Sequence, residues 1–135
     1  MADPVKIHRS PCVSCPYRQD VPSGIWSGEE YDKIVPYDND TGFQPPRLFM
    51  CHQNDESLCR GWLDCHGRDL LALRLAAIRD EIDQETLYEA MGQTPAVPVF
   101  ATAAEAAEHG RRDIDKPDAE ACRLMEKITT KRGFQ

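Results

Sequence analysis

The chain has 135 residues, a net charge of −7 and six cysteines. This length suits one domain with a core of its own, which we expect to span residues 1–135. The acidic charge argues against broad electrostatic binding to nucleic acid or to an anionic membrane. No apolar run is long enough to span a membrane, and the first residues show no signal peptide. We therefore expect a cytoplasmic protein, in which clustered cysteines are more often metal ligands than disulfides.

The first candidate site is the segment Ser10–Pro16, where Cys12 and Cys15 form a CxxC pair. The prolines on either side keep this pair out of a helix and favour a turn. A CxxC turn points two thiolates at one ion, as in zinc knuckles and iron–sulfur loops. A thioredoxin-like redox pair has the same spacing, but the residues that follow lack the helical period which that fold requires.

The segment between the CxxC pair and the next cysteine is expected to be mostly loop, with one short helix. Ser27 and Glu30 form a capping box, so the helix should start there and end before Pro36. Residues 37–46 read as a loop, and we interpret their acidic residues as solvated turn residues.

Three of the cysteines and two of the histidines lie within residues 51–66. The apolar run just before them should carry Cys51 into the interior. Three interpretations stay open: an all-cysteine site for one ion, a site in which another residue replaces one cysteine, and a centre with several metals or a cluster. The candidate ligands are Cys12, Cys15, Cys51 and Cys59, with His52, Cys65 and His66 as alternates.

Zinc is the expected metal, because it is the commoner stabiliser of small cytosolic domains. An iron–sulfur cluster is the alternative, since the spacing from Cys51 to Cys59 is looser than in a second zinc knuckle. Phe49 and Trp62 are expected to shield the centre from water. Nearby arginines would stabilise the negative thiolates. Five arginines lie within four residues of a cysteine that is a candidate ligand: Arg9, Arg18, Arg47, Arg60 and Arg68.

Residues 67–135 are expected to form a small helical bundle. The strongest helix is predicted at 69–83, with the stripe Leu71, Leu75, Ile78 and Ile82 at helical spacing. Three more helices are predicted at about Gln84–Met91, from the Thr102 capping box to Gly110, and at about Asp118–Thr130. The last of them should bury Cys122 in the core. The predicted fold class is mainly α, with an irregular metal-stapled N-terminal lobe at residues 9–66 packed on these helices.

Several motifs resemble an uncharacterised family of small cysteine-rich actinobacterial and actinophage proteins. They are Cys-x-x-Cys-Pro-Tyr-Arg-x-Asp-Val-Pro-Ser-Gly-x-Trp, Leu-Phe-Met-Cys-His-Gln and Cys-x-Gly-Trp-Leu-x-Cys-His. The resemblance extends from about residue 9 to the last helix. The family carries a domain of unknown function, so the resemblance implies a host type and no activity. Its cysteine-rich motifs fall on Cys12, Cys15, Cys51, His52 and Cys59, and less closely on Cys65 and His66.

These features predict a non-enzymatic, metal-stabilised binding or regulatory protein that acts through a protein partner. An iron–sulfur redox or sensor protein is the alternative. A metal-dependent hydrolase or nuclease is a third hypothesis, for which His52, His66, Asp64 and Asp69 could supply a site. Against it, no base is paired with a nucleophile, and the acidic charge disfavours a nucleic-acid substrate.

Overall fold

The computed structural model describes residues 5–51 and 54–132. Its sheet has the strand order β1-β3-β2, in which β1 (Lys6–Ile7) is parallel and β2 (Met50–Cys51) antiparallel to the central strand β3 (Asn54–Leu58). Cys51 thus ends β2 and is buried, as the apolar run before it predicts.

About half of the chain is helical, in agreement with the predicted mainly α class. The described residues contain six α-helices: α1 (Gly28–Ile34), α2 (Arg60–His66), α3 (Leu71–Ile78), α4 (Gln84–Met91), α5 (Ala103–Arg112) and α6 (Ala119–Arg132). Short 3₁₀ turns follow α1 and α2.

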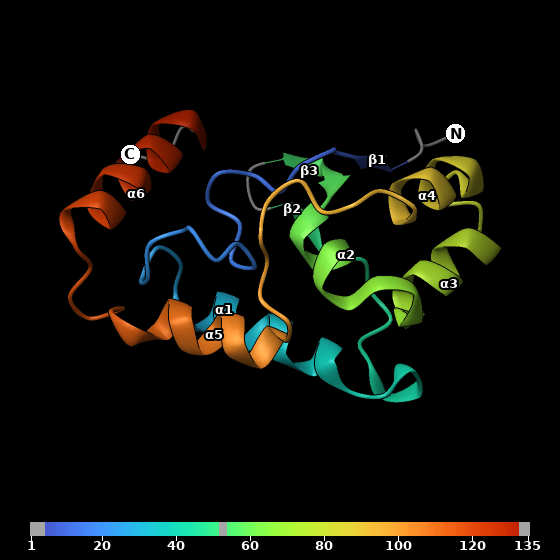
Figure 1. The fold of residues 1–135 in the computed structure, drawn as a ribbon, viewed down its shortest axis with the longest axis horizontal. Coiled ribbons are helices and arrows are strands. Elements are labelled where there is room, and N and C mark those ends of the chain that lie inside the picture. Colours follow the sequence, from blue (N-terminus) through green and yellow to red (C-terminus); the bar gives the residue numbers. More distant parts are fainter. Residues whose placement is uncertain (1–4, 52–53, 133–135) are drawn as a thin grey trace.

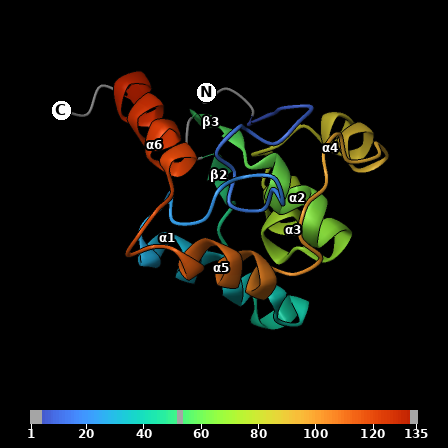
Figure 2. The ribbon, with the colours of Figure 1, turned by 60° about the vertical axis from the view of Figure 1, so that its left-hand side comes forward.

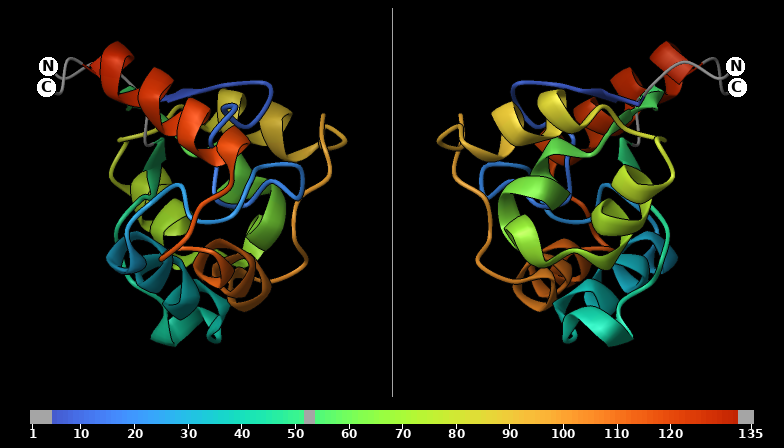
Figure 3. Two further views of the ribbon diagram at one scale, coloured as in Figure 1. Left: turned by 90° about the vertical axis from the view of Figure 1, so that its left-hand side faces the viewer. Right: turned by 90° about the vertical axis from the view of Figure 1, so that its right-hand side faces the viewer.

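Helices α3 and α4 lie at one end of the molecule and α6 at the other, with the sheet and α2 between them (Figure 1). Helices α1 and α5 run side by side along a further edge (Figures 2 and 3). They approach closely because Gly110 of α5 faces the ring of Tyr31 of α1, where any added Cβ would collide with that ring.

One large buried cluster joins the cysteine-rich half of the chain to the helical half. Its members include Tyr17, Trp62, Leu73 and Ala107. A smaller cluster holds α6 against the N-terminal loop through Val21, Ile25, Ala121 and Ile128. The two predicted parts, 9–66 and 67–135, therefore share one core.

The cysteine-rich segment has more regular structure than the irregular lobe that was predicted. Residues 54–58 form β3 and residues 60–66 form α2. The sequence of β3, Asn-Asp-Glu-Ser-Leu, has no apolar alternation, so it carries no strand signal. It is a strand because β1 and β2 pair with it on both sides, and tertiary context of this kind overrides local propensity.

Helix α3 is shorter than predicted, and the predicted stripe is buried only in part: Ile82 is buried beyond the end of the helix, Leu71 and Leu75 are half-buried, and Ile78 is exposed. The chain leaves the helix after Ile78 and turns at Asp80, which has a φ of 58°. Ala72, Leu73 and Ala76 face the core, while Ile78 is 78% exposed. The predicted stripe and the set Ala72, Leu73 and Ala76 both have helical spacing. Which of the two faces is buried therefore depends on what packs against the helix.

The predicted starts of α4 and α5 are confirmed by their caps. The Thr86 backbone N–H donates to the Asp83 carboxylate over 3.2 Å, and the Glu105 N–H donates to the Thr102 hydroxyl over 3.1 Å. Helix α4 ends before Gly92 as predicted, whereas α5 continues two residues beyond Gly110. Ser27 occupies the N-cap of α1 without a side-chain cap bond.

The predicted burial of Cys122 was wrong, because this residue of α6 is exposed. The buried face of the helix passes through Ala121 and Ile128. Cys122 comes one residue after Ala121, and a step of one residue turns the side chain by about 100° around the helix.

Candidate metal centre

The CxxC segment forms two successive turns. The Cys15 N–H donates to the Cys12 carbonyl over 3.0 Å, and the Arg18 N–H donates to the Cys15 carbonyl over 3.1 Å. Cys15 is 1% exposed, while Cys12 is half-buried. This turn agrees with the prediction made from the flanking prolines.

The other two principal candidates come from the sheet and from the start of a helix. Cys51 ends β2, and Cys59 is the N-cap of α2. The Cys59 N–H donates to the Phe49 carbonyl over 2.8 Å, which fixes the start of α2 against β2. Cys51 and Cys59 are both buried.

These four thiols are neighbours. Cys15 Sγ and Cys59 Sγ lie 3.7 Å apart. The thiols of Cys15 and Cys51 are close enough to Cys12 to affect its pKa. No disulfide joins any of the six cysteines, all of which are described.

The surroundings of Cys12 and Cys15 favour the protonated thiols, because the pKa of each is raised. The pKa of Cys12 is raised chiefly by its hydrogen bond with Cys15 and further by burial. The pKa of Cys15 is raised well above its usual value. The hydrogen bond with Cys12 lowers the pKa of Cys15, but the contact with Cys59 and burial raise it by more. A hydrogen bond from the Tyr17 backbone N–H lowers this pKa by a smaller amount. Such an N–H would stabilise a thiolate if the proton were lost.

The neighbouring thiols do not yet form a coordination shell. In residues 5–51 and 54–132, no three Cys, His, Asp or Glu side chains are arranged so that they could hold a metal ion. The contacts join Cys12 to Cys15, Cys12 to Cys51 and Cys15 to Cys59, so they form a chain of pairs.

The alternate ligands have other surroundings. His52 lies outside the described residues. Cys65 and His66 line a polar cavity of about 430 Å³ together with Asp38. Within the described chain, no hydrogen bond connects either residue to the four thiols. Burial and nearby carboxylates, Asp38 first among them, raise the pKa of Cys65 to about 12.

The helix α2 closes over the CxxC loop at Gly61. A Cβ at this position would collide with Cys15 Sγ and would lie 2.8 Å from Tyr17 Cβ. Phe49 and Trp62 belong to the same buried cluster as Cys15 and Cys59. The expectation that these aromatic rings exclude water from the thiols is consistent with this burial.

Of the five arginines near cysteines, Arg18 is the one whose contacts fit the expected role. Its guanidinium donates to the carbonyls of Pro11 and Cys12 over 3.2 and 3.4 Å. The pKa of Arg18 is raised, first by Asp20 and then by smaller effects that include Cys15 and Cys12. Arg60 instead pairs with Asp64 over 2.8 Å inside the core. Arg9 and Arg47 are exposed, and the side chain of Arg68 is outside the described part of the chain.

A hydrogen-bonded group beside the thiols was missed from the sequence. Tyr17 Oη and His66 Nε2 lie 2.9 Å apart, and His66 Nδ1 is 3.8 Å from Asp38 Oδ1. Burial lowers the pKa of His66, so the neutral ring is favoured. Asp38 also accepts the N–H groups of Ala103 and Ala104 at the start of α5 over 2.7 and 2.8 Å. These contacts join residues 28 to 66 positions apart, and no local sequence pattern predicts them.

The chain belongs to the family of unknown function DUF6283, whose sequence profile matches residues 7–123. This confirms the resemblance to a family of unknown function that the cysteine-rich motifs indicated. Searches of curated proteins and of solved structures found no match. Across the described helices, none combines the length and the apolar character that crossing a bilayer demands.

Proposed function

We propose that this chain is a non-enzymatic binding or regulatory protein whose fold is stabilised by one zinc ion. The proposed ligands are Cys12, Cys15, Cys51 and Cys59. They come from the CxxC loop, the end of β2 and the start of α2, so one ion would staple three separate segments into one lobe.

The observation that carries this proposal is the 3.7 Å separation of Cys15 Sγ and Cys59 Sγ. Thiolates bind zinc at about 2.3 Å in a tetrahedron, which places neighbouring sulfur atoms about 3.8 Å apart. Cys15 and Cys59 thus have the spacing of two ligands of one ion. The side chains of Cys12 and Cys51 would need to turn toward this pair to complete the shell.

The same distance favours zinc over a four-iron cluster. In such a cluster each thiolate binds a different iron, so the sulfur atoms stand apart by the width of the cluster. Cys15 and Cys59 would have to separate to admit it. Moving Cys15 to make room for the cluster would also disturb its close contact with Gly61.

A role without catalysis follows from the proposed coordination. Four thiolates close the zinc shell and leave no open position for water or substrate. His66 is hydrogen-bonded to Tyr17, and Asp64 is paired with Arg60. Both side chains are thus engaged in other contacts, which favours a role without catalysis over the hydrolase hypothesis.

The test is the metal content of protein purified without oxygen from cells supplied with both zinc and iron. We expect one zinc per chain by elemental analysis and by native mass spectrometry. Cys15→Ser and Cys59→Ser should lose it, whereas Cys122→Ser should retain it because Cys122 is exposed on α6.

A folded wild-type protein without metal would overturn the proposal. A brown protein with iron and labile sulfide would replace it with the iron–sulfur alternative. The Cys122→Ser control separates loss of a ligand from the general effect of replacing a thiol.

A further inference from the structure

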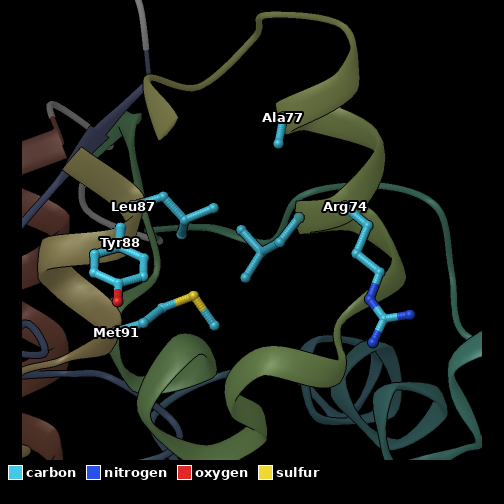
Figure 4. Close-up of a pocket in the computed structure, with 6 residues that line it drawn as sticks. Arg74, Ala77, Leu87, Tyr88 and Met91 are labelled. Atoms are coloured by element: carbon cyan, nitrogen blue, oxygen red, sulfur yellow. The ribbon is translucent and has the colours of Figure 1, made fainter. Parts of the chain in front are cut away.

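A polar cavity of about 430 Å³ lies beside α2 and the start of α5. Its other walls come from the 3₁₀ turns at Val35–Asp38 and Thr41–Phe43 and from the residues next to them. The volume is within the range of small-ligand sites, about 300–1,000 Å³. The groove between α3 and α4 differs in chemistry, because apolar side chains such as Leu87 and Met91 line it (Figure 4). The polar cavity is lined by several charged groups, so its lining indicates the class of ligand that fits.

The cavity has a negative lining. Apart from His66, the charged residues in its described lining are all carboxylates, namely Asp38, Asp40 and Asp69. Arg74 offsets part of the charge of Asp69, from which it is 3.3 Å away. Asp38 already accepts the N–H groups of Ala103 and Ala104, so these donors at the start of α5 are not available to an anion. The cavity therefore favours a cation.

A buried histidine with an open nitrogen is a second, independent sign of a ligand. The side chain of His66 is 7% exposed, and its Nε2 lies 2.9 Å from Tyr17 Oη. Its Nδ1 has no hydrogen bond with any residue that the structure describes, and it lies 3.8 Å from Asp38 Oδ1. Hydrogen bonds span about 2.9 Å, so these two atoms are too far apart to bond each other, and one donor nitrogen between them could reach both. Because a buried polar atom without a partner is costly, this place suits a ligand that carries N–H groups.

Hydrogen bonds hold the walls of the cavity in place. The Gln44 side-chain amide donates to the Asn39 carbonyl over 3.0 Å and accepts the Leu71 N–H over 2.9 Å. The Thr41 hydroxyl donates to the Asp69 carbonyl over 2.8 Å. These bonds tie the 3₁₀ turn to the start of α3, so the cavity is formed before a ligand enters. Binding to a preformed site costs less conformational entropy.

We propose that this cavity binds a guanidinium group, which belongs either to an arginine of a partner protein or to a free guanidino compound. A guanidinium has five N–H donors in one plane, so it can donate to Asp38 and to His66 Nδ1 together. It is also more weakly hydrated than an ammonium group and loses less on entering a cavity. A metal ion fits less well, because no three Cys, His, Asp or Glu side chains in the described chain are arranged to hold one. This inference goes beyond the proposed zinc site and does not depend on it.

The experiment titrates n-butylguanidinium into the isotopically labelled full chain. Nuclear magnetic resonance follows the ring nitrogens of His66, which are assigned by comparison with His66→Gln protein. We expect a saturable shift at His66 Nδ1 and none at His109, whose Nε2 lies 2.7 Å from the Val21 carbonyl oxygen and which is not part of the described lining of the cavity. Tetramethylammonium has the charge without N–H donors and should bind at least about tenfold more weakly.

Charge-neutral variants locate the binding site. Asp38→Asn should weaken binding by about tenfold or more, because it removes a charged acceptor. Asp40→Asn combined with Asp69→Asn leaves Asp38 at the start of α5 and should weaken binding by about threefold, with a smaller dependence on salt. Glu85→Gln combined with Glu89→Gln is the matched control. It removes two charges from exposed residues of α4 that are not part of the described lining of the cavity, and binding should stay unchanged.

A further probe distinguishes the two sources of the guanidinium. The capped tripeptide acetyl-Gly-Arg-Gly-amide presents the group as a protein does. If it binds at least as tightly as n-butylguanidinium, the site fits an arginine of a partner. If the free compound alone binds, the site fits a small molecule. Either result supports a guanidinium site.

Three results would overturn the inference. One is the lack of a saturable shift at His66 with n-butylguanidinium at up to about 50 mM, far above the roughly millimolar affinity of so small a ligand. The others are equal binding of n-butylammonium, and binding that both sets of aspartate variants leave unchanged. Zinc is measured in the same samples. Guanidinium binding by a metal-free wild type would contradict the zinc proposal alone, and a zinc-loaded protein without guanidinium binding would contradict this inference alone.

Discussion

Replacing Gly61 with Ala tests the contact between α2 and the CxxC loop. Gly61 lies in the first turn of α2, and its missing side chain makes room for Cys15 and Tyr17. An added methyl group would lie 2.8 Å from Tyr17 Cβ and still closer to Cys15 Sγ, whereas ordinary contacts begin at 3.4 Å. The loop or the helix would therefore have to move by at least about 0.6 Å within a close-packed core.

Two opposing effects set the magnitude of this change. Alanine is favoured over glycine within a helix by about 1 kcal/mol, so a helix free of neighbours would become more stable. Forcing an extra methyl group into a packed core costs about 1–3 kcal/mol, and displacement of the buried Cys15 places this site at the upper end. We expect Gly61→Ala to lower the free energy of unfolding by about 1–2 kcal/mol, the difference between the two effects.

The assay is urea denaturation followed by circular dichroism, with the slope of the transition checked for two-state behaviour. Gly92→Ala is the matched control, because a Cβ there would make contacts no closer than 3.6 Å and Gly92 has a right-handed helical conformation. Its free energy of unfolding should stay close to that of the wild type. A Gly61→Ala protein as stable as the wild type, or more stable, would refute the packing of α2 on the CxxC loop.

Two further substitutions test buried polar contacts by the same measurement. Asp64→Ala should lower the free energy of unfolding by about 3–5 kcal/mol, because the Arg60 and Asp64 side chains are 2% and 3% exposed and the change leaves the arginine charge unpaired. Recovery of stability in an Arg60→Met, Asp64→Leu double variant would confirm that cause. A small loss of stability in Asp64→Ala would contradict it. Asp38→Ala should cost about 1 kcal/mol by removing the acceptor for two N–H groups at the start of α5. Asp40→Ala is its control, and equal effects of the two changes would argue against the capping role.

A structural feature could be predicted from the sequence when the residues that cause it are close together in the chain. The caps at Asp83 and Thr102 bond to residues three positions away, so the pattern alone located the starts of α4 and α5. The CxxC turn also depends on neighbouring prolines. In contrast, β3 owes its conformation to two strands that pair with it, and its own residues favour neither strand nor helix.

In the candidate site, too, features that depend on local sequence were predicted and those that depend on distant residues were not. Four clustered cysteines could be grouped from their spacing, and Cys15 and Cys59 lie 3.7 Å apart although 44 residues separate them. Asp38 was interpreted as a solvated turn residue because its neighbours are turn formers. Its role at α5 depends on residues 65 and 66 positions further along the chain, and no sequence period carries that information.

The shared core changes what metal removal should do. From the sequence alone, chelation is expected to loosen residues 9–66 while the later helices keep part of their structure. In the structure, Tyr17 and Trp62 belong to the same buried cluster as Leu73 of α3 and Ala107 of α5. Helix α6 is the exception, because it packs in its own cluster against Val21 and Ile25.

We therefore expect chelation of the proposed zinc to reduce amide protection in α2, α3 and α5 together. Hydrogen exchange measured by mass spectrometry before and after chelation reports each helix separately. Cys59→Ser protein serves as the control, since it should have the exchange pattern of the chelated wild type and should not respond to chelator. Full protection of α3 and α5 beside an unprotected segment 9–66 would refute the coupling, because it would mean that the two parts fold independently despite their common core.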